Sequence, residues 1–198
     1  MNTAGHAIHD VWIENGIAYS SNWRDGIVAV DIGGFKSSEK DRSDIGFNPL
    51  LVKAGNGSPS NPIQLASFPD FKGRNHSAFP FSSRSTGNFY IVMGDEVFPN
   101  GLENLINNKP SQPRGGFHFI NFSDPDNPVE DAAYIVPEAG SHNQWVHGDM
   151  LLAAFYQGGI RILDISGELL GDLYKQEREI GYYLPQHRDG MFRVSSRI

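Results

Sequence analysis

The chain contains an internal repeat, in which a strand–turn–strand pattern recurs without a gap. The segment IHDVWIENGIAYSSNWRDGIVAVDIGG at 8–34 aligns with SHNQWVHGDMLLAAFYQGGIRILDISG at 141–167. The identical pairs are His9/His142, Trp12/Trp145, Gly26/Gly159, Ile27/Ile160, Asp31/Asp164, Ile32/Ile165 and Gly34/Gly167. Identity spread over a whole strand–turn–strand unit indicates a repeat architecture, in which each copy is one supersecondary unit.

A third copy lies between these two and is lengthened by insertions. Its three strands are predicted in NHSAFPF (75–81), NFYIVMGDE (88–96) and GGFHFINFSDPDNP (115–128). A fourth short strand closes each copy, at NPIQLASFPDF (61–71), NPVEDAAYIVP (127–137) and REIGYYLP (178–185). Asn-Pro openings and Pro endings are typical of outer strands, which lose ladder hydrogen bonds at little cost.

Units of four short strands with repeated aromatic and glycine positions predict an all-β fold, namely a β-propeller with three visible blades. The predicted blades are 8–71, 75–137 and 141–185, within one region over 1–185, and the tail 186–198 matches nothing earlier. Helix signals are weak. The segment 167–179 has room for one or two helical turns, but Gly171 interrupts it.

Three blades predict an open or partial propeller, because closed propellers have four to eight blades. Two alternatives follow from this. Either the chain is a piece of a longer propeller, or two copies self-associate through their open blade edges to give six blades. We favour the first alternative.

The composition excludes several classes of protein and ligand. A net charge of −7 with no basic stripe argues against a nucleic-acid partner. No apolar run approaches the roughly 18 residues of a membrane helix, so no membrane span is predicted. The absence of cysteine excludes disulfides and thiolate chemistry. The first residues, MNTAGHAIHD, lack the pattern of a signal peptide.

The repeats GIVAVDIGG, GFHFINFSDPDNP and GIRILDISG resemble the LVIVD-repeat family, and the likeness covers nearly all of 5–185. The resemblance implies a bacterial or archaeal β-propeller whose biochemical role is mostly uncharacterised. It also implies an exported protein, in the periplasm or at the cell surface. Members of the family usually carry an export signal and further blades. Neither is visible here, which favours a partial chain.

A histidine opens the first strand of each copy, at His9, His76 and His142. In a propeller blade the first strand lines the axis and successive strands reverse direction. The start of strand one and the loop from strand two to strand three therefore lie on the same face of the disc. We expect the three imidazoles to converge there, beside the acidic residues Asp10, Asp95 and Glu96.

Two interpretations of this cluster remain open. In the first, His9, His76, His142 and Asp10 bind a divalent metal ion, since neutral imidazoles and carboxylates are common ligands. In the second, each histidine donates a hydrogen bond to a backbone carbonyl of a neighbouring blade and fixes strand one. The repetition alone does not separate them.

The function predicted first is a binding or scaffold module with a His-lined face at the axis, for an unknown small-molecule or protein ligand. The alternative is a metal-dependent hydrolase or oxidoreductase, with Asp95 or Glu96 as its catalytic acid or base. A third alternative is a part of a larger chain with no function of its own. The remaining repeated polar residues, Asp31, Asn121 and Asp164, end strand three in each copy and are expected to cap turns.

Overall fold

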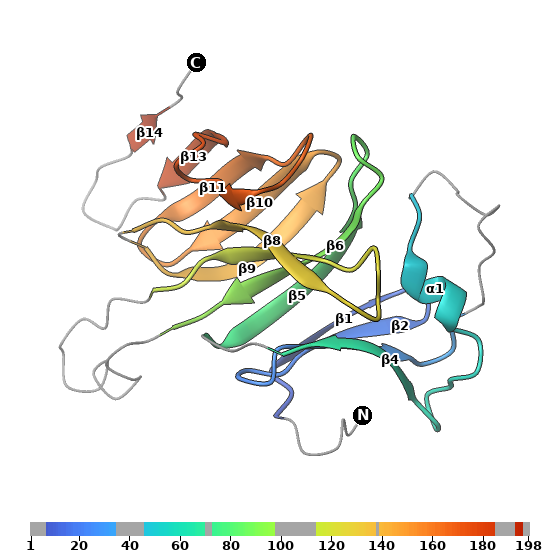
Figure 1. Ribbon diagram of the computed structural model, residues 1–198. Coiled ribbons are helices and arrows are strands. Elements are labelled where there is room, and N and C mark those ends of the chain that lie inside the picture. Colours follow the sequence, from blue (N-terminus) through green and yellow to red (C-terminus); the bar gives the residue numbers. More distant parts are fainter. Residues whose placement is uncertain are drawn as a thin grey trace, which may run out of the picture.

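The repeated segments fold into three antiparallel sheets in the computed structural model (Figure 1). The structure describes residues 7–34, 46–69, 73–97, 114–137, 139–184 and 193–195. The predicted all-β class is confirmed. None of the helices within these ranges is long or apolar enough to span a membrane.

Each sheet takes its main strands, in chain order, from one of the repeats. The first sheet contains β1 (Asp10–Glu14), β2 (Ile17–Ser21), β3 (Ile27–Asp31) and β4 (Ile63–Phe68). The second contains β5 (Asn75–Ser82), β6 (Phe89–Asp95), β7 (Phe117–Asn121) and β8 (Val129–Tyr134). The third contains β9 (Ser141–His147), β10 (Met150–Phe155), β11 (Gly159–Asp164), β13 (Glu179–Leu184) and β14 (Arg193–Ser195).

Apolar side chains pack in two layers between these sheets. One core cluster joins the first and second sheets and includes Tyr19, Ile91 and Phe122. The other joins the second and third sheets and includes Phe119 and Leu151. The second sheet therefore lies in the middle, and its first strand β5 contacts both β1 and β9. The described strands do not join into a closed sheet.

Three local features differ from the sequence-based expectations. Helix α1 (Pro49–Lys53) was missed, although its N-cap Asn48 and the following proline are a recognisable start signal. The segment 167–179 forms no helix. Instead β12 (Gly171–Asp172) pairs in parallel with β8 of the second sheet, and turns follow it. The tail supplies β14, which pairs with β13; its other residues lie outside the described ranges.

Candidate functional site

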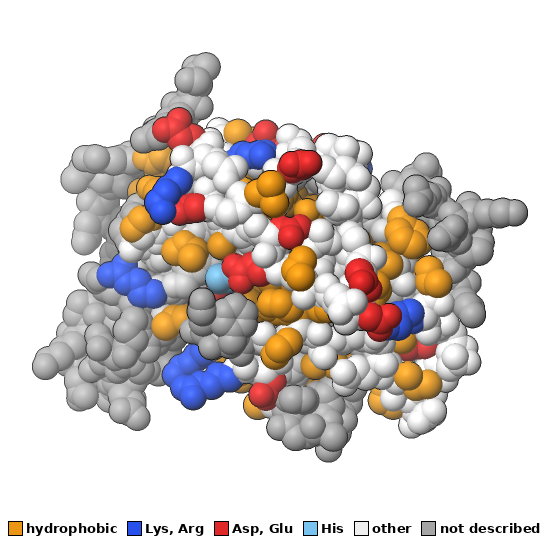
Figure 2. All heavy atoms as spheres, in the orientation of Figure 1, with side chains coloured by type: hydrophobic (Ala, Val, Ile, Leu, Met, Phe, Trp, Pro, Cys, Tyr) orange, Lys and Arg blue, Asp and Glu red, His pale blue; other side chains and the backbone are white. Residues whose placement is uncertain are grey.

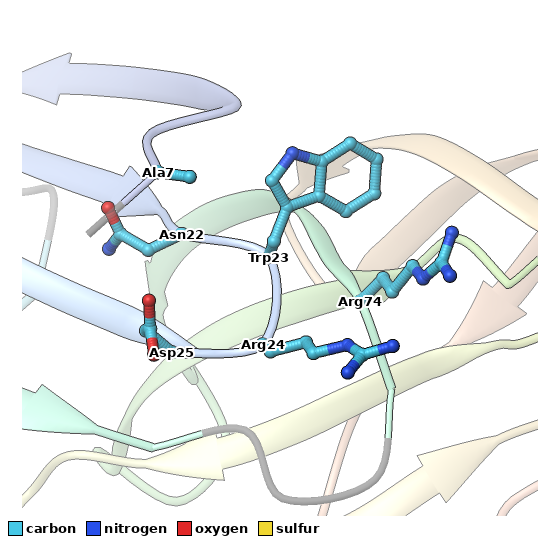
Figure 3. Close-up of a pocket in the computed structure, with 6 residues that line it drawn as sticks. All are labelled: Ala7, Asn22, Trp23, Arg24, Asp25 and Arg74. Atoms are coloured by element: carbon cyan, nitrogen blue, oxygen red, sulfur yellow. The ribbon is translucent and has the colours of Figure 1, made fainter.

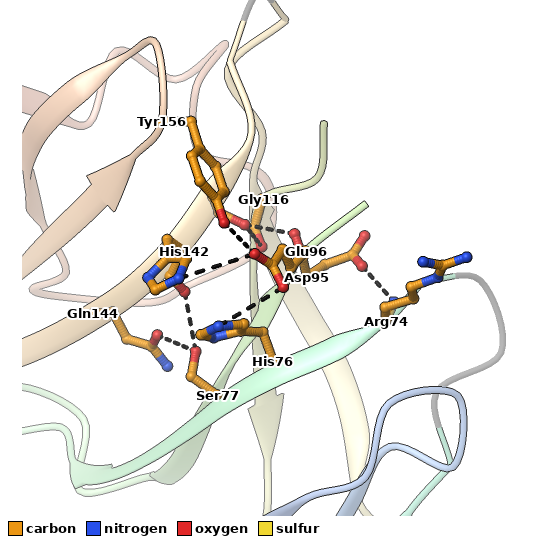
Figure 4. A network of polar contacts seen from close by, with 10 residues as sticks. Arg74, His76, Ser77, Asp95, Glu96, Gly116, His142, Gln144 and Tyr156 are labelled. Carbon is orange, nitrogen blue, oxygen red and sulfur yellow. Dashed lines mark hydrogen bonds and ion pairs between the residues drawn. The ribbon is translucent and has the colours of Figure 1, made fainter. Parts of the chain in front are cut away.

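The three repeated histidines meet at one end of the innermost strands. The ring centroid of His76 lies 4.5 Å from that of His9. It lies 4.2 Å from that of His142 (Figure 4). His76 is thus the centre of a row of three imidazoles, one from each sheet. The expected convergence is observed.

A β-bulge in the inner strands aims these rings at one another. On β5, Asn75 pairs with Asp95 while Ser77 pairs with Gly94, so one extra residue is inserted at His76. The pairing of β9 with β10 shifts in the same way beside His142. In a regular strand, residues three positions apart point to opposite faces. The extra residue of the bulge changes this, so that the histidine and the residue three positions later point to the same face.

The residues three positions after the histidines form a second layer of aromatic rings. The ring of Trp12 lies 4.5 Å from Phe79 and 4.9 Å from Trp145, and Phe79 lies 5.2 Å from Trp145. These distances suit favourable ring contacts. Trp12 is partly buried and packs against the core of the first two sheets, whereas Trp145 is 52% exposed.

In each sheet, a residue of the loop just after the second strand contacts the histidine of that sheet. The Trp23 ring lies 4.2 Å from His9, and the Tyr156 ring lies 5.3 Å from His142. At the equivalent position of the middle sheet stands the buried Glu96, whose Oε2 lies 3.8 Å from His76 Nε2. The middle sheet alone places a carboxylate where the outer sheets have aromatic rings.

Glu96 bridges two imidazoles and a phenol. Its Oε1 lies 3.9 Å from His142 Nε2, and it accepts a hydrogen bond from the hydroxyl of Tyr156 (Figure 4). Burial, together with this bond to a carboxylate, raises the pKa of Tyr156. Sequence reasoning missed Tyr156 as a partner of Glu96. Its alignment with Trp23 placed it on the correct loop but did not show its contacts.

The other two acidic candidates bond to backbone N–H groups. The Oδ1 of Asp95 accepts a hydrogen bond from the backbone N–H of Arg74 at 2.6 Å (Figure 4). Asp10 is exposed, and its Oδ1 accepts from the N–H of Val11 at 2.8 Å. The charge of Asp10 also acts on the central imidazole, where it raises the pKa of His76.

His76 combines deep burial with an unpaired ring nitrogen. The residue is 7% exposed, and its Nδ1 has no hydrogen-bond partner. Burial lowers the pKa of His76; Glu96 opposes this effect, while the neighbouring His142 and His9 add to it. A lowered pKa favours the neutral imidazole, which is the form that binds metal ions.

The backbone-locking interpretation of the histidines is not supported. Within the described ranges, no hydrogen bond joins the side chain of His9, His76 or His142 to a backbone carbonyl. The rings face one another and Glu96 instead. A buried imidazole nitrogen without a hydrogen-bond partner lowers the stability of the fold by about 1–3 kcal/mol. Stabilisation of the fold therefore does not explain why His76 is buried here.

The donor set fits a divalent transition metal ion. Single ligand atoms of His9, His76 and Glu96 all lie within 4.8 Å of one another. In a tetrahedral site with bonds of about 2.1 Å the ligand atoms lie about 3.4 Å apart, so these atoms would have to approach one another by up to roughly 1.4 Å. His142 is the fourth donor within reach of Glu96.

Comparisons with known proteins identify no relative. No protein-family model, curated protein or solved structure matches the chain. Any functional conclusion therefore depends on the geometry of the histidine row.

Proposed function

We propose that this protein is a binding module whose histidine row holds a divalent transition metal ion. The proposal depends on one observation: one ligand atom each of His9, His76 and Glu96 lie within 4.8 Å of one another, and His76 and Glu96 are buried. In the expected site His9, His76 and Glu96 are ligands and His142 completes the set. Asp10 and Asp95 are not ligands in this proposal.

Nitrogen and carboxylate donors favour zinc and its first-row neighbours over calcium and magnesium, which prefer all-oxygen sites. The phenol of Tyr156 would act as the outer partner that orients Glu96. Such partners of metal ligands are a general feature of metal sites, and their loss typically weakens metal affinity 10- to 100-fold.

Zinc titration of the chelator-treated protein tests the proposal. We expect the wild-type chain to bind one equivalent of Zn²⁺ by isothermal titration calorimetry, with a rise in Tm because the ion binds the folded state. His76→Ala should weaken binding by at least about 100-fold, because a ligand matters more than the outer partners do. Glu96→Gln should weaken it in the same direction.

His147→Ala is the matched control, because His147 is an exposed histidine on the same strand as His142 but outside the row. This variant should bind zinc like the wild type. Circular dichroism should show the wild-type β spectrum for every variant. Zinc binding that is substoichiometric, or that His76→Ala leaves unchanged, contradicts the proposal.

A metal-dependent hydrolase or oxidoreductase is the second candidate function. It is favoured by the exposure of the row on its outer side, since the side chain of His142 is 39% exposed and His9 is also exposed. A metal held there would keep a position open for water, as catalytic zinc sites do. Zinc-dependent hydrolysis of 4-nitrophenyl acetate that His76→Ala abolishes would support it. Equal rates in wild type and variant would exclude this hydrolysis.

We also propose that the three sheets are blades of a propeller of the LVIVD-repeat kind, open at both flanks. Supporting this arrangement, each repeat forms one antiparallel sheet and the three first strands lie side by side. The open flanks would be covered by further blades of a longer chain or by a second copy of this one.

A further inference from the structure

A cavity adjoins the histidine row. Its volume is about 320 Å³, within the usual range of small-molecule sites. The lining residues are Ala7, Asn22, Trp23, Arg24, Asp25 and Arg74 (Figure 3). Trp23 belongs to both places, because its ring forms part of this wall and also contacts His9.

Backbone pairing between two sheets brings the two arginines of this cavity together. Trp23 at the β2–β3 turn and Asn75 at the start of β5 exchange backbone hydrogen bonds of 3.1 and 2.9 Å. In an antiparallel bridge the flanking residues also face each other, so Arg24 lies opposite Arg74. Both guanidinium groups project to the same side, at the right of Figure 3.

This juxtaposition is unfavourable without an anion. Like charges that are directly opposed across paired strands destabilise each other. Within the described residues, neither guanidinium has a hydrogen-bond or ion-pair partner. The side chains of Asn22 and Asp25 lie on the far side of the turn (Figure 3), and the Asn22 amide is engaged by Ser20 and Gly26.

The backbone of the turn is strained at the residue between the two sites. Trp23 has a φ of 51°, a left-handed conformation that is unusual for a bulky side chain. Such outliers persist where the surrounding structure fixes them, and they cluster at ligand sites. Here the ring of the strained residue contacts His9.

We infer that this cavity binds the carboxylate or phosphate group of a small aryl anion. Arg24 and Arg74 hold the anionic group, since guanidinium matches both anions through paired hydrogen bonds. The indole of Trp23 packs against the ring. Figure 2 shows separate Lys and Arg side chains on this face, two of them at the left and lower left of the molecule. The inference goes beyond metal binding and does not require it.

Phenyl phosphate and benzoate are the probes, with benzyl alcohol as the neutral analogue. We expect both anions to bind the chelator-treated protein in isothermal titration calorimetry, and benzyl alcohol not to bind. Arg24→Gln and Arg74→Gln should each weaken phenyl phosphate binding about tenfold or more. Arg84→Gln, in the turn between β5 and β6 at the other end of these strands, should leave it unchanged.

The result separates this inference from the metal proposal. Phenyl phosphate binding without zinc, lost in the two arginine variants, supports the cavity whether or not zinc binds. Anion binding only to the zinc-loaded protein, unchanged by Arg24→Gln and Arg74→Gln, places the anion on the metal and overturns the inference. Equal binding of benzyl alcohol, or no binding of either anion, also overturns it.

Discussion

At the scale of single residues, Asp31 shows how one repeated side chain stabilises a turn. Its Oδ1 accepts hydrogen bonds from the N–H groups of Gly33 and Gly34, and its Oδ2 accepts from residues 55–57. Burial by itself would raise the pKa of Asp31, but these N–H groups together lower it to about 2. The ionised carboxylate is therefore part of the fold.

Acid should remove this contribution. Because the folded-state pKa of Asp31 lies below its ordinary value of 3.8, its stabilisation is complete above about pH 5. It is lost as the pH falls through about 2. We expect Asp31→Asn to lower the free energy of unfolding by about 2 kcal/mol at pH 6, and by much less at pH 2. Urea unfolding of both proteins measures this, and an equal difference at both pH values would contradict it.

The sequence predicted this role because the capping position recurs in all three repeats. Asn121 and Asp164 likewise accept hydrogen bonds from the N–H two residues later. It also predicted the meeting of the histidines. It placed Glu96 beside the imidazoles but could not predict the hydrogen bond from Tyr156 to Glu96, because the insertion at 97–114 hides which residue of the middle repeat corresponds to Tyr156.

At the scale of strands, a glycine sets the start of β11. Gly159 has a φ of 69°, and a Cβ atom there would lie 2.2 Å from the backbone oxygen of Tyr183 on the neighbouring β13. Gly167 has the same φ of 69°, but nothing lies within 4 Å of its Cβ position. The two glycines have the same backbone conformation, but only Gly159 has a neighbouring strand packed against its Cα atom.

Alanine substitution should separate these two effects. Gly167→Ala should cost about 1–2 kcal/mol, the penalty for a left-handed conformation. Gly159→Ala should cost more, because β13 must also move away from β11 and weaken the ladder. Chemical denaturation of both variants gives the comparison. Equal losses of unfolding free energy in the two variants would show that the close contact with β13 adds nothing to the cost of the substitution.

The sequence predicted where the strands lie, but it did not predict where their pairing is irregular. Alternation and β-branched residues predict that a segment such as 75–81 is extended. They give no sign of the extra residue at His76, which depends on the pairing of Asn75 and Ser77 with β6. The same bulge turns the histidine toward the site. The direction of a catalytic or binding side chain can thus depend on register that only the folded pairing defines.

At the scale of the whole molecule, the order of the sheets follows from the repeats, because each repeat buries its apolar surface against its neighbour. The outermost sheets have no such neighbour among the described residues. On the third sheet, β-pairing places Trp145, Leu152, Ile160 and Tyr183 on one face. All four are exposed, Ile160 to 43% and Leu152 to 37%. We call these four residues the outer face.

An apolar outer face of this kind favours association through the flank that a further blade would cover. We expect the isolated chain to self-associate as its concentration rises in sedimentation velocity experiments. Ile160→Lys should shift it toward monomer, because the lysine charge would be buried without a partner. Lys175→Ala, at an exposed lysine outside the outer face, is the control and should behave like the wild type. A wild-type chain that stays monomeric at every concentration would contradict this prediction.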